Sequence, residues 1–272
     1  MKSKKKYLIH IIIVFIIILT ISPFIWMILT SLKTFQESIQ VPPDILPKVF
    51  QWHNYSTVFK QFPFLAFYFN TFASVIGVVV GQVLVSSMAA YAFAKIEFPG
   101  RNVLFVIMLM LLMIPSQVFI IPQFQIMVKL HLTDTVAALI LPGIFNVFGT
   151  FLLRQFFMSV PKELTEAALI DGCNHFQIFY KIMLPLVKPA LIALSILTAM
   201  WTWQSLLWPL IVNSSLNKET LSAGLALLIG QHNTVYPLVM AAGVLSIWPM
   251  IIIFFVFQKK FIEGIAISGS KG

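Results

Sequence analysis

The 272-residue sequence predicts an all-α protein that crosses a membrane six times. Hydrophobic residues make up 59% of the chain, charged residues make up 10%, and the mean hydropathy is +0.94. Nine acids and eighteen bases are too few to cover the surface of a soluble protein of this length. Six apolar stretches have the length of a membrane span. They fall at approximately 8–31, 66–94, 103–128, 136–158, 186–212 and 236–257.

The first stretch follows a basic start, so a cleaved signal peptide is the competing interpretation. No acid, lysine or arginine lies between Tyr7 and Leu32, and a helix of about 26 residues is roughly 39 Å long. That exceeds the apolar region of a signal peptide, and no small-residue cleavage site follows it. We therefore expect the first stretch to be a retained span.

Prolines and charges set the limits of the other elements. The segment 33–61 carries Pro42, Pro43, Pro47 and scattered charges, which predicts an external loop or short surface elements. Pro115 and Pro122 interrupt the third stretch and predict a kink or an early end. Pro142 has the same effect near the start of the fourth. The sequence contains no second soluble domain and no clear repeat, so we expect one transmembrane domain over 1–272.

The distribution of lysine and arginine predicts the orientation, because cytoplasmic loops of membrane proteins are enriched in both. With a cytoplasmic N-terminus, thirteen bases lie inside and five lie outside. The five outer bases are Lys33, Lys48, Lys60, Lys129 and Lys218. Both termini and the loop from Val160 to Lys188 are thus predicted to be cytoplasmic, in the cell membrane. The +9 net charge is explained by this bias better than by a nucleic-acid partner, because the bases are spread over loops and ends.

The sequence lacks the residues that several classes of protein function require. No carboxylate, histidine or arginine lies in a span interior, where an ion-coupled carrier usually holds one. The glycines of Gly264–Ser270 have phosphate-loop spacing, but Ser270 stands where such a loop needs lysine. The single Cys173 allows no intramolecular disulfide, and no Cys/His cluster has metal-ligand spacing. We therefore expect no catalytic site, no metal and no cofactor in this chain.

The cytoplasmic segment 159–185 is polar and amphipathic. Pro161 suits the first turn of a helix, and Glu163 favours the positive end of its dipole. Asp171-Gly172 indicates a turn or a helix C-terminus. Phe176, Phe179, Tyr180 and Met183 then recur at helical spacing. The pattern predicts a helix, a turn and a second helix with an aromatic face, and that face either binds a protein partner or lies on lipid headgroups.

This segment resembles the EAA motif of the permease subunits of ABC importers. The resemblance rests on Glu166-Ala167-Ala168, Asp171-Gly172, Leu184-Pro185 and Pro189. It implies a type I ABC importer permease fold with six transmembrane helices and a cytoplasmic helix-turn-helix coupling loop that docks onto an ATPase subunit. It also implies the residues that couple to the ATPase: Glu166, Ala167, Ala168, Asp171, Gly172, Phe176, Leu184 and Pro185.

The resemblance extends over nearly the whole chain to the carbohydrate-type permeases, the group of the smaller membrane subunit of maltose importers. Four motifs carry it within the first hundred residues: Ser31-Leu32-Lys33-Thr34, Trp52-His53-Asn54-Tyr55, Phe69-Asn70-Thr71 and Tyr91-Ala92-Phe93-Ala94. The tail Phe257-Gln258-Lys259-Lys260-Phe261, ending Gly269-Ser270-Lys271-Gly272, also resembles that group. Ile267 and Ser268 depart from its glycine-rich ending.

A sugar pathway should be lined by neutral hydrogen-bonding groups and aromatic faces. The spans supply Gln82, Ser86, Ser87, Gln117, Asn146, Trp201, Trp203, Gln204 and Trp208. Of these we expect Gln82, Ser86, Gln117, Asn146, Trp203 and Gln204 to face the substrate pathway. Gln204, between tryptophans, is the first choice. The serines are also compatible with helix packing, and the tryptophans with anchoring at the membrane interface.

The resemblance thus implies a permease subunit of an ATP-driven, binding-protein-dependent importer of a sugar or oligosaccharide. Its implied partners are a second homologous permease subunit, two ATPase subunits that use ATP and Mg²⁺, an extracytoplasmic solute-binding protein and the lipid bilayer, with no nucleic acid. Two alternatives remain. One is the same importer class carrying glycerophosphate esters or another polar solute, and the other is a stand-alone channel or facilitator.

Overall fold

The computed structural model describes residues 2–229 and 234–269, with side chains at 6, 9–229 and 234–256. Within this part of the chain every regular element is a helix. The chain divides into two compact units. The first comprises 1–65 and 224–251, and the second comprises 66–223 and 252–272. The predicted tail motif begins at Phe257, so its side chains lie outside the described residues, as do those of Lys2, Lys4 and Lys5.

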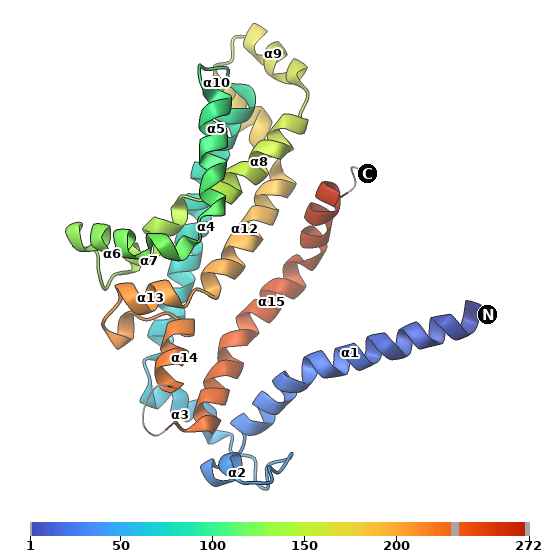
Figure 1. Ribbon diagram of the computed structural model, residues 1–272, viewed down its shortest axis with the longest axis vertical. Helices are drawn as coiled ribbons and strands as arrows, with labels where there is room; N and C mark the ends of the chain where they lie inside the picture. The colour runs from blue at the N-terminus through green and yellow to red at the C-terminus, as the bar shows by residue number, and fades with distance from the viewer. Residues whose placement is uncertain (1, 230–233, 270–272) are drawn as a thin grey trace. The chain divides into compact units, whose positions relative to one another are not determined.

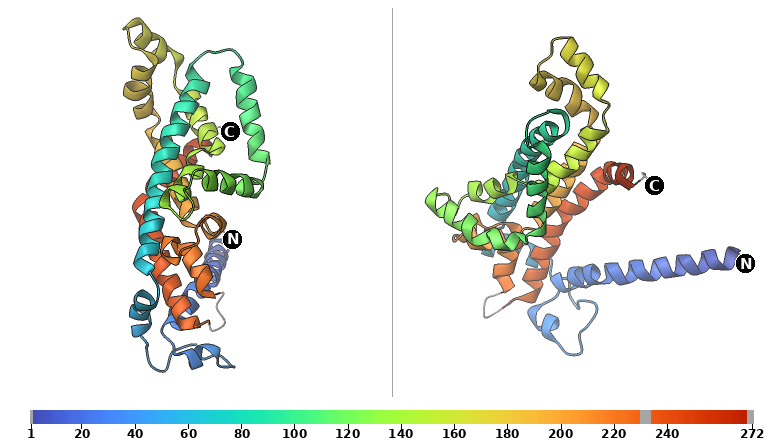
Figure 2. Two further views of the ribbon diagram at one scale, coloured as in Figure 1. Left: turned by 90° about the vertical axis from the view of Figure 1, so that its left-hand side faces the viewer. Right: turned by 45° about the horizontal axis from the view of Figure 1, so that its top comes forward.

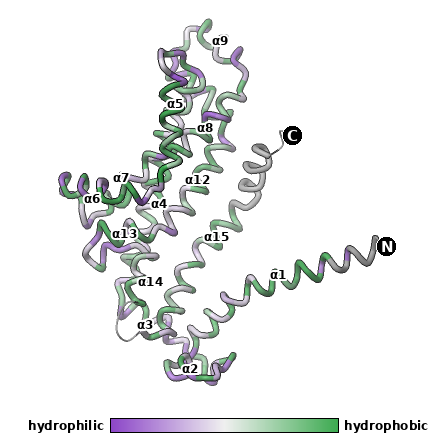
Figure 3. The backbone as a smooth tube through the Cα atoms, in the orientation of Figure 1, coloured by the Kyte–Doolittle hydropathy of each residue, from purple (hydrophilic) through white to green (hydrophobic). Residues whose placement is uncertain are grey.

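Three described helices are individually long and apolar enough to cross a membrane. They lie within α1 (Lys2–Ser31), α4 (Phe64–Lys95) and α15 (Tyr236–Gly269). Hydrophobic residues dominate the described part of α1 in Figure 3. Three further candidate spans are helix pairs bent at a short break. The described residues therefore contain three candidate spans that are single helices, or up to six candidate spans when each bent pair is one span.

The stretch predicted at 103–128 is one of these bent pairs. It forms α5 (Arg101–Met110) with η1 (Leu111–Met113), then η2 (Ser116–Phe119) with α6 (Ile120–Lys129), and the halves meet at 97°. The break is at Pro115, which has an extended backbone and no N–H to continue the helix. Pro122 lies in the first turn of α6 and breaks nothing, because the N–H groups there have no helical acceptor.

The stretches predicted at 136–158 and 186–212 are also interrupted. The former is α7 (Val136–Ile144) and α8 (Val147–Ser159), bent by 45° after Phe145 and not at Pro142. The latter is α12 (Lys188–Trp203) and α13 (Leu207–Val212), separated by residues 204–206. The third bent pair of candidate spans does not coincide with this stretch, because it joins His175–Leu186 to Lys188–Trp203. In the second unit, α9 (Lys162–Ile170) and α10 (His175–Gln177) lie at one end of α4, and α13 lies toward the other (Figures 1 and 2).

Small residues let α4 and α7 pack closely in the second unit. A methyl group added to Gly77 or Gly81 would overlap the side chain of Ile140 or Ile144. On α7, a methyl group on Gly143 would come within 2.9 Å of Val78. Glycines at such a crossing bring two backbones together in a membrane. The crossing places Gln82, one residue after Gly81, beside the break between α7 and α8.

In the first unit, two of the sequence motifs form one hydrogen-bonded network at the end of α1. The Asn54 amide on α3 (His53–Gln61) donates to the carbonyls of Ser31 (2.8 Å) and Lys33 (3.0 Å). The Ser31 hydroxyl meets the Tyr55 hydroxyl at 2.7 Å. Lys33 donates to the carbonyl of Asp44 and lies over the Trp26 ring. The carbonyls that α1 leaves without helical partners are thus satisfied by segment 44–55. The longer segment 33–61, to which these residues belong, also contains α2 (Phe35–Ile39).

The loop 213–221 of the second unit is fixed in the same way. Asn70 donates to the carbonyls of Asn217 and Glu219, and the Thr71 hydroxyl accepts the N–H of Leu221. Asp134 accepts from the backbone N–H groups of Ser214 and Ser215 and from the Ser215 hydroxyl. These bonds join the start of α4, the turn before α7 and the loop between α13 and α14 (Leu221–Ile229).

Replacing Asn54 with alanine tests the first network. The variant leaves two carbonyls without donors in a buried site, which should lower the free energy of unfolding by about 1–3 kcal/mol. Ser56→Ala, on the exposed side of α3, is the control and should stay within about 0.5 kcal/mol of wild type. Thermal unfolding in detergent checks the difference. Equal midpoints for the two variants would contradict the proposed role of Asn54.

Glu219 makes the second unit sensitive to pH. Its side chain is 3% exposed, and Oε2 has no hydrogen-bond partner within the described part of the chain. Burial, and then the charge of Asp134, raise the pKa of Glu219 from 4.5 to about 7. The hydrogen bonds from Ser215 lower the pKa of Asp134. Between pH 4.5 and about 7 the folded chain therefore holds a proton on Glu219 that the unfolded chain has lost.

The thermal midpoint of the wild type should accordingly fall as the pH rises from 5 to about 7 and then level off. Glu219→Gln is neutral at every pH, so its midpoint should lack this fall and exceed that of the wild type above pH 7. Midpoints at pH 5, 6, 7 and 8 measure both curves. Parallel curves would show that Glu219 does not hold the proton.

Candidate functional site

The cytoplasmic segment predicted at 159–185 begins with α9. Glu163 lies in its first turn and Pro161 precedes it. The helix ends at Ile170, followed by Asp171 as its C-terminal cap and by Gly172 with φ of 82°. The N–H of Cys173 donates to the carbonyl of Ala168, and that of Gly172 donates to Leu169. These two bonds form a Schellman motif, whose left-handed position favours glycine.

The second half of the segment is helical from His175 to Leu186, but its middle is not α-helical. Asn174 caps α10 through a capping box with Gln177. A π-helical stretch, η3 (Ile178–Met183), follows, and then α11 (Leu184–Leu186). Pro185 lies within α11 and does not end the helix. The axis turns by 78° before α12 begins at Lys188.

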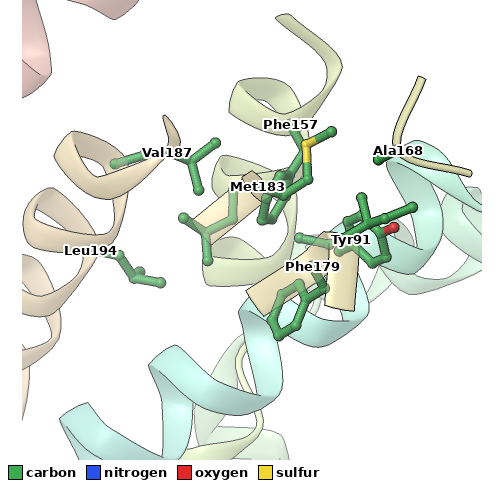
Figure 4. Packing of buried hydrophobic residues seen from close by; sticks show 11 residues of the cluster. Tyr91, Phe157, Ala168, Phe179, Met183, Val187 and Leu194 are labelled. Atoms are coloured by element: carbon green, nitrogen blue, oxygen red, sulfur yellow. The ribbon is translucent and has the colours of Figure 1, made fainter. Parts of the chain in front are cut away.

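The inner face of the segment is buried against α4 and α8. Ala168, Ile178, Phe179 and Met183 join Tyr91 and Phe157 in one apolar cluster. The Tyr91 ring lies 5.9 Å from Phe157 and 5.3 Å from Phe179 between centroids. Figure 4 shows these side chains gathered between the helices. Burying one large apolar side chain contributes about 1.5–3 kcal/mol, so the cluster holds the segment firmly on α4 and α8.

The outer face of the segment carries apolar side chains that are exposed. Ile170 is 86% exposed, Phe176 69% and Tyr180 65%, and Leu164 and Leu169 are also exposed. The single aromatic face expected from Phe176, Phe179, Tyr180 and Met183 is therefore divided, because Phe179 and Met183 pack inside with Tyr91 and Phe157. On α9, Glu166 and Ala167 are exposed and Ala168 is buried. Leu184 is partly buried and Pro185 is exposed.

A second feature is a cavity of about 260 Å³ within the second unit, here called the polar cavity because polar and apolar residues line it in equal number. Residues from α4, α6, α7, α12 and α13 line it, and so do residues at the breaks after α7 and α12. Gln82 and Asn146, two of the predicted pathway residues, both line it. Trp201 and Trp208 line it as well, together with Gln123, Thr198, Thr202 and Ser205, which the sequence analysis missed.

The other predicted pathway residues lie outside this lining. Ser86 is fully buried, and its hydroxyl lies 3.5 Å from the carbonyl of Asn146. Trp203 is buried edge-on against Phe72. Gln117 and Gln204 are exposed, Gln117 in η2 and Gln204 at the end of α12. In the sequence, polar residues recur at helical spacing within an apolar stretch at Thr198, Thr202 and Ser205, and this pattern is the signal that could have identified them.

Comparison with known proteins decides the family. The model of the family described as "Binding-protein-dependent transport system inner membrane component" matches residues 82–266. The chain belongs to this family. The resemblance found in the sequence is thereby confirmed: the protein is the permease component of a binding-protein-dependent transport system, with the type I ABC permease fold. A component of this kind transports and is not itself catalytic.

Individual relatives of this permease cover nearly its whole length. It is 38% identical over 261 residues to the arabinooligosaccharides transport system permease protein AraQ of Halalkalibacterium halodurans, covering 95% of this chain and 94% of that one. It is 35% identical to the sn-glycerol-3-phosphate transport system permease protein UgpE of Yersinia enterocolitica, covering 84% of each. The chain is also similar to a chain in the crystal structure of a bacterial ABC transporter involved in the import of the acidic polysaccharide alginate. The TM-score is 0.84 and the identity is 27%, and the match covers 96% of this chain and 98% of that one.

The Schellman turn of the permease provides a test of local geometry. Nothing lies within 4 Å of a methyl group added to Gly172, so Gly172→Ala acts through the backbone alone and costs about 1–2 kcal/mol. Gly172→Asn should cost less, because asparagine adopts left-handed conformations more readily. Hydrogen exchange of residues 168–174 should be roughly fivefold to thirtyfold faster in the alanine variant, with the asparagine variant between it and wild type. Equal rates in all three proteins would contradict this account of the turn.

Proposed function

We propose that this permease forms half of the translocation pathway of an ATP-driven importer of a sugar or oligosaccharide. The observation that carries the proposal is the two-faced segment 159–185, whose inner face packs on α4 and α8 and whose outer face is apolar and exposed. An exposed apolar surface of this kind is typical of a protein interface. The AraQ relative supports a sugar as cargo.

The outer face of this segment is the proposed docking surface for an ATPase subunit. It comprises Leu164, Glu166, Ala167, Leu169, Ile170, Phe176 and Tyr180, all of them exposed. Asp171 and Gly172 fix the turn between its two halves, and Leu184 and Pro185 lead back to α12. The lipid-headgroup alternative is less well supported, because this segment bears only Lys162 and Lys181 as cations, against Glu163, Glu166 and Asp171.

Four kinds of partner complete the proposed importer. They are a second homologous permease subunit, two ATPase subunits, an extracytoplasmic solute-binding protein and the lipid bilayer. We infer that ATP and Mg²⁺ are bound by the ATPase subunits, because this sequence has no phosphate loop with its lysine. Three long apolar helices and three bent helix pairs support six spans in one permease domain. The lysine and arginine bias supports an orientation with both termini and the docking surface in the cytoplasm.

The proposed mechanism is a rigid-body movement. Closure of the ATPase subunits would displace the docking surface, and the apolar cluster of Tyr91, Phe157, Phe179 and Met183 would pass the displacement to α4 and α8. Gln82 lies nine residues before Tyr91 on α4, or about 14 Å along a helix. Movement at the cytoplasmic end would therefore reach the polar cavity through a continuous helix.

A glycerophosphate ester is the second candidate cargo, because UgpE is a relative of similar coverage. An anionic cargo favours a basic residue in the cavity, since burying an unpaired charge is costly. The lining of the cavity, as far as the described side chains form it, contains no charged group. This observation favours the neutral cargo.

Copurification tests the proposed function. Tagged chain extracted in mild detergent should bring a second permease and an ATPase, with ATPase activity in the same sample. Phe176→Ala should reduce recovery of the ATPase about tenfold or more, because a large side chain at the centre of an interface contributes about 2 kcal/mol. Glu166→Ala should uncouple ATP hydrolysis from sugar uptake.

Ile45→Ala, an exposed apolar residue of segment 33–61, serves as the matched control and should leave ATPase recovery unchanged. If the Phe176 variant retains the ATPase as well as this control does, the docking surface is refuted. A chain that purifies alone and passes solute through vesicles without ATP would instead establish a passive facilitator.

A further inference from the structure

The polar cavity lies where two helices of the second unit are broken. Asn146 stands at the break between α7 and α8, and Ser205 stands between α12 and α13, and both line the cavity. Backbone at membrane depth that is not helical is tolerated only when it is buried in protein or lines an aqueous cavity. Both breaks therefore point to a hydrated chamber within the membrane-spanning part of the chain.

Two lining residues have polar atoms without partners. Gln82 and Thr198 are each 2% exposed, and neither the Gln82 amide nitrogen nor the Thr198 hydroxyl makes a hydrogen bond to any described residue. A buried polar group without a partner costs about 1–3 kcal/mol. Rotation of the terminal amide or of the hydroxyl would present either donor to a molecule in the cavity. A ligand with hydroxyl oxygens would satisfy both.

The space for Gln82 depends on Gly149 of α8. A methyl group there would lie 3.1 Å from the Gln82 amide nitrogen and 2.9 Å from the Ser86 hydroxyl. Asn146 holds this turn by accepting the N–H of Gly149 at 2.9 Å. The break between α7 and α8 thus positions the Gln82 amide as well as opening the cavity.

The aromatic lining residues are held in fixed orientations. The Trp208 indole donates its N–H to the carbonyl of Ala138 at 2.9 Å. This hydrogen bond fixes the orientation of the ring. Trp201 is half exposed and rests edge-to-face on Phe148, with 5.5 Å between centroids. Rigid aromatic surfaces beside neutral donors suit the C–H faces and hydroxyls of a sugar ring.

We propose that this chain itself holds a substrate site, in which one uncharged sugar unit of the cargo binds among Gln82, Asn146, Thr198, Trp201 and Trp208. The proposal rests on the proposed function and specifies its cargo as neutral. A volume of about 260 Å³ lies just below the usual range of about 300–1,000 Å³ for a ligand pocket, so it accommodates one unit of an oligosaccharide and not the whole chain. An acidic sugar or a phosphate ester would enter a lining without any cation.

Cysteine labelling in the assembled transporter tests the site. In a Cys173→Ser background, Thr202→Cys places a thiol in the cavity. Ala199→Cys, three residues away on α12, places one in the apolar groove lined by Val75, Val79 and Ile196. A neutral hydrophilic thiol reagent should label the cavity position at least about tenfold faster than the groove position. Anionic and cationic reagents of equal size should label the cavity at rates within about threefold of each other, because the lining bears no charge.

Cargo protection gives the second measurement. Neutral trisaccharides (arabinotriose, maltotriose, cellotriose) are compared with an alginate trisaccharide and sn-glycerol 3-phosphate. At least one neutral trisaccharide should slow labelling of Thr202→Cys, and neither anion should. Adding Gln82→Leu or Thr198→Val should raise the trisaccharide concentration that halves the labelling rate about fivefold, which is the effect of one lost hydrogen bond. Ser195→Ala, whose hydroxyl bonds to the carbonyl of Leu191, is the matched control and should not change it.

Three results would overturn the site. They are equal labelling of cavity and groove, labelling at least tenfold faster by the anionic reagent than by the cationic one, and protection by the anions or by none of the solutes. Failure of the proposed function is distinguishable, because it appears as an isolated chain without ATPase activity. A transporter with cargo-stimulated ATPase activity and a failed labelling pattern rejects the substrate site alone.

Discussion

The packing of segment 159–185 on α4 and α8 is the interaction on which the functional arrangement of the second unit depends. The segment is polar and lies between two apolar stretches of the chain. A few large apolar side chains hold it against α4 and α8. Tyr91 touches both Phe157 and Phe179, so one ring joins three elements. His175 adds a weak polar contact to the Tyr91 hydroxyl at 3.4 Å. Because Phe179 and Met183 are buried in this cluster, Phe176 and Tyr180 remain on the surface, where the proposed docking surface requires them.

The same helices carry the second feature of the unit. Gln82 and Tyr91 are both on α4, and Gly149 and Phe157 are both on α8. The two helices are joined near the cluster by Arg154, which donates to the carbonyl of Phe93 at 3.2 Å and lies over the Phe105 ring. Near the cavity, Gly149 permits close approach of Gln82 and Ser86. The two helices are therefore packed together both near the apolar cluster and near the cavity. The proposed rigid-body movement requires such packing, because α4 and α8 must move together.

Much of this fold follows from the sequence, because a membrane imposes a strong constraint on length and composition. The positions of the apolar stretches were predictable, and so was the glycine turn after α9. The breaks after α7 and α12 were not, because neither falls at a proline. Pro142 lies within α7, and residues 204–206 contain no proline. Asn54 and Asn70 belong to motifs visible in the sequence, but their partners lie 21–23 and 147–149 residues away. Periodicity reports only which residues share a face of one helix, so it cannot identify such partners.

The distribution of charge connects these observations. A carrier driven by an ion gradient binds its ion at a titratable group inside the membrane, whereas the lining of the polar cavity has none. On the proposed function, the energy for transport must then enter from outside the membrane as movement. The exposed face of segment 159–185 can receive such movement because its inner face is immobilised by apolar packing. Neutral lining and mechanical coupling are consistent with each other for this reason: the cavity needs to change its access to the two sides of the membrane, and it needs no change in its own charge.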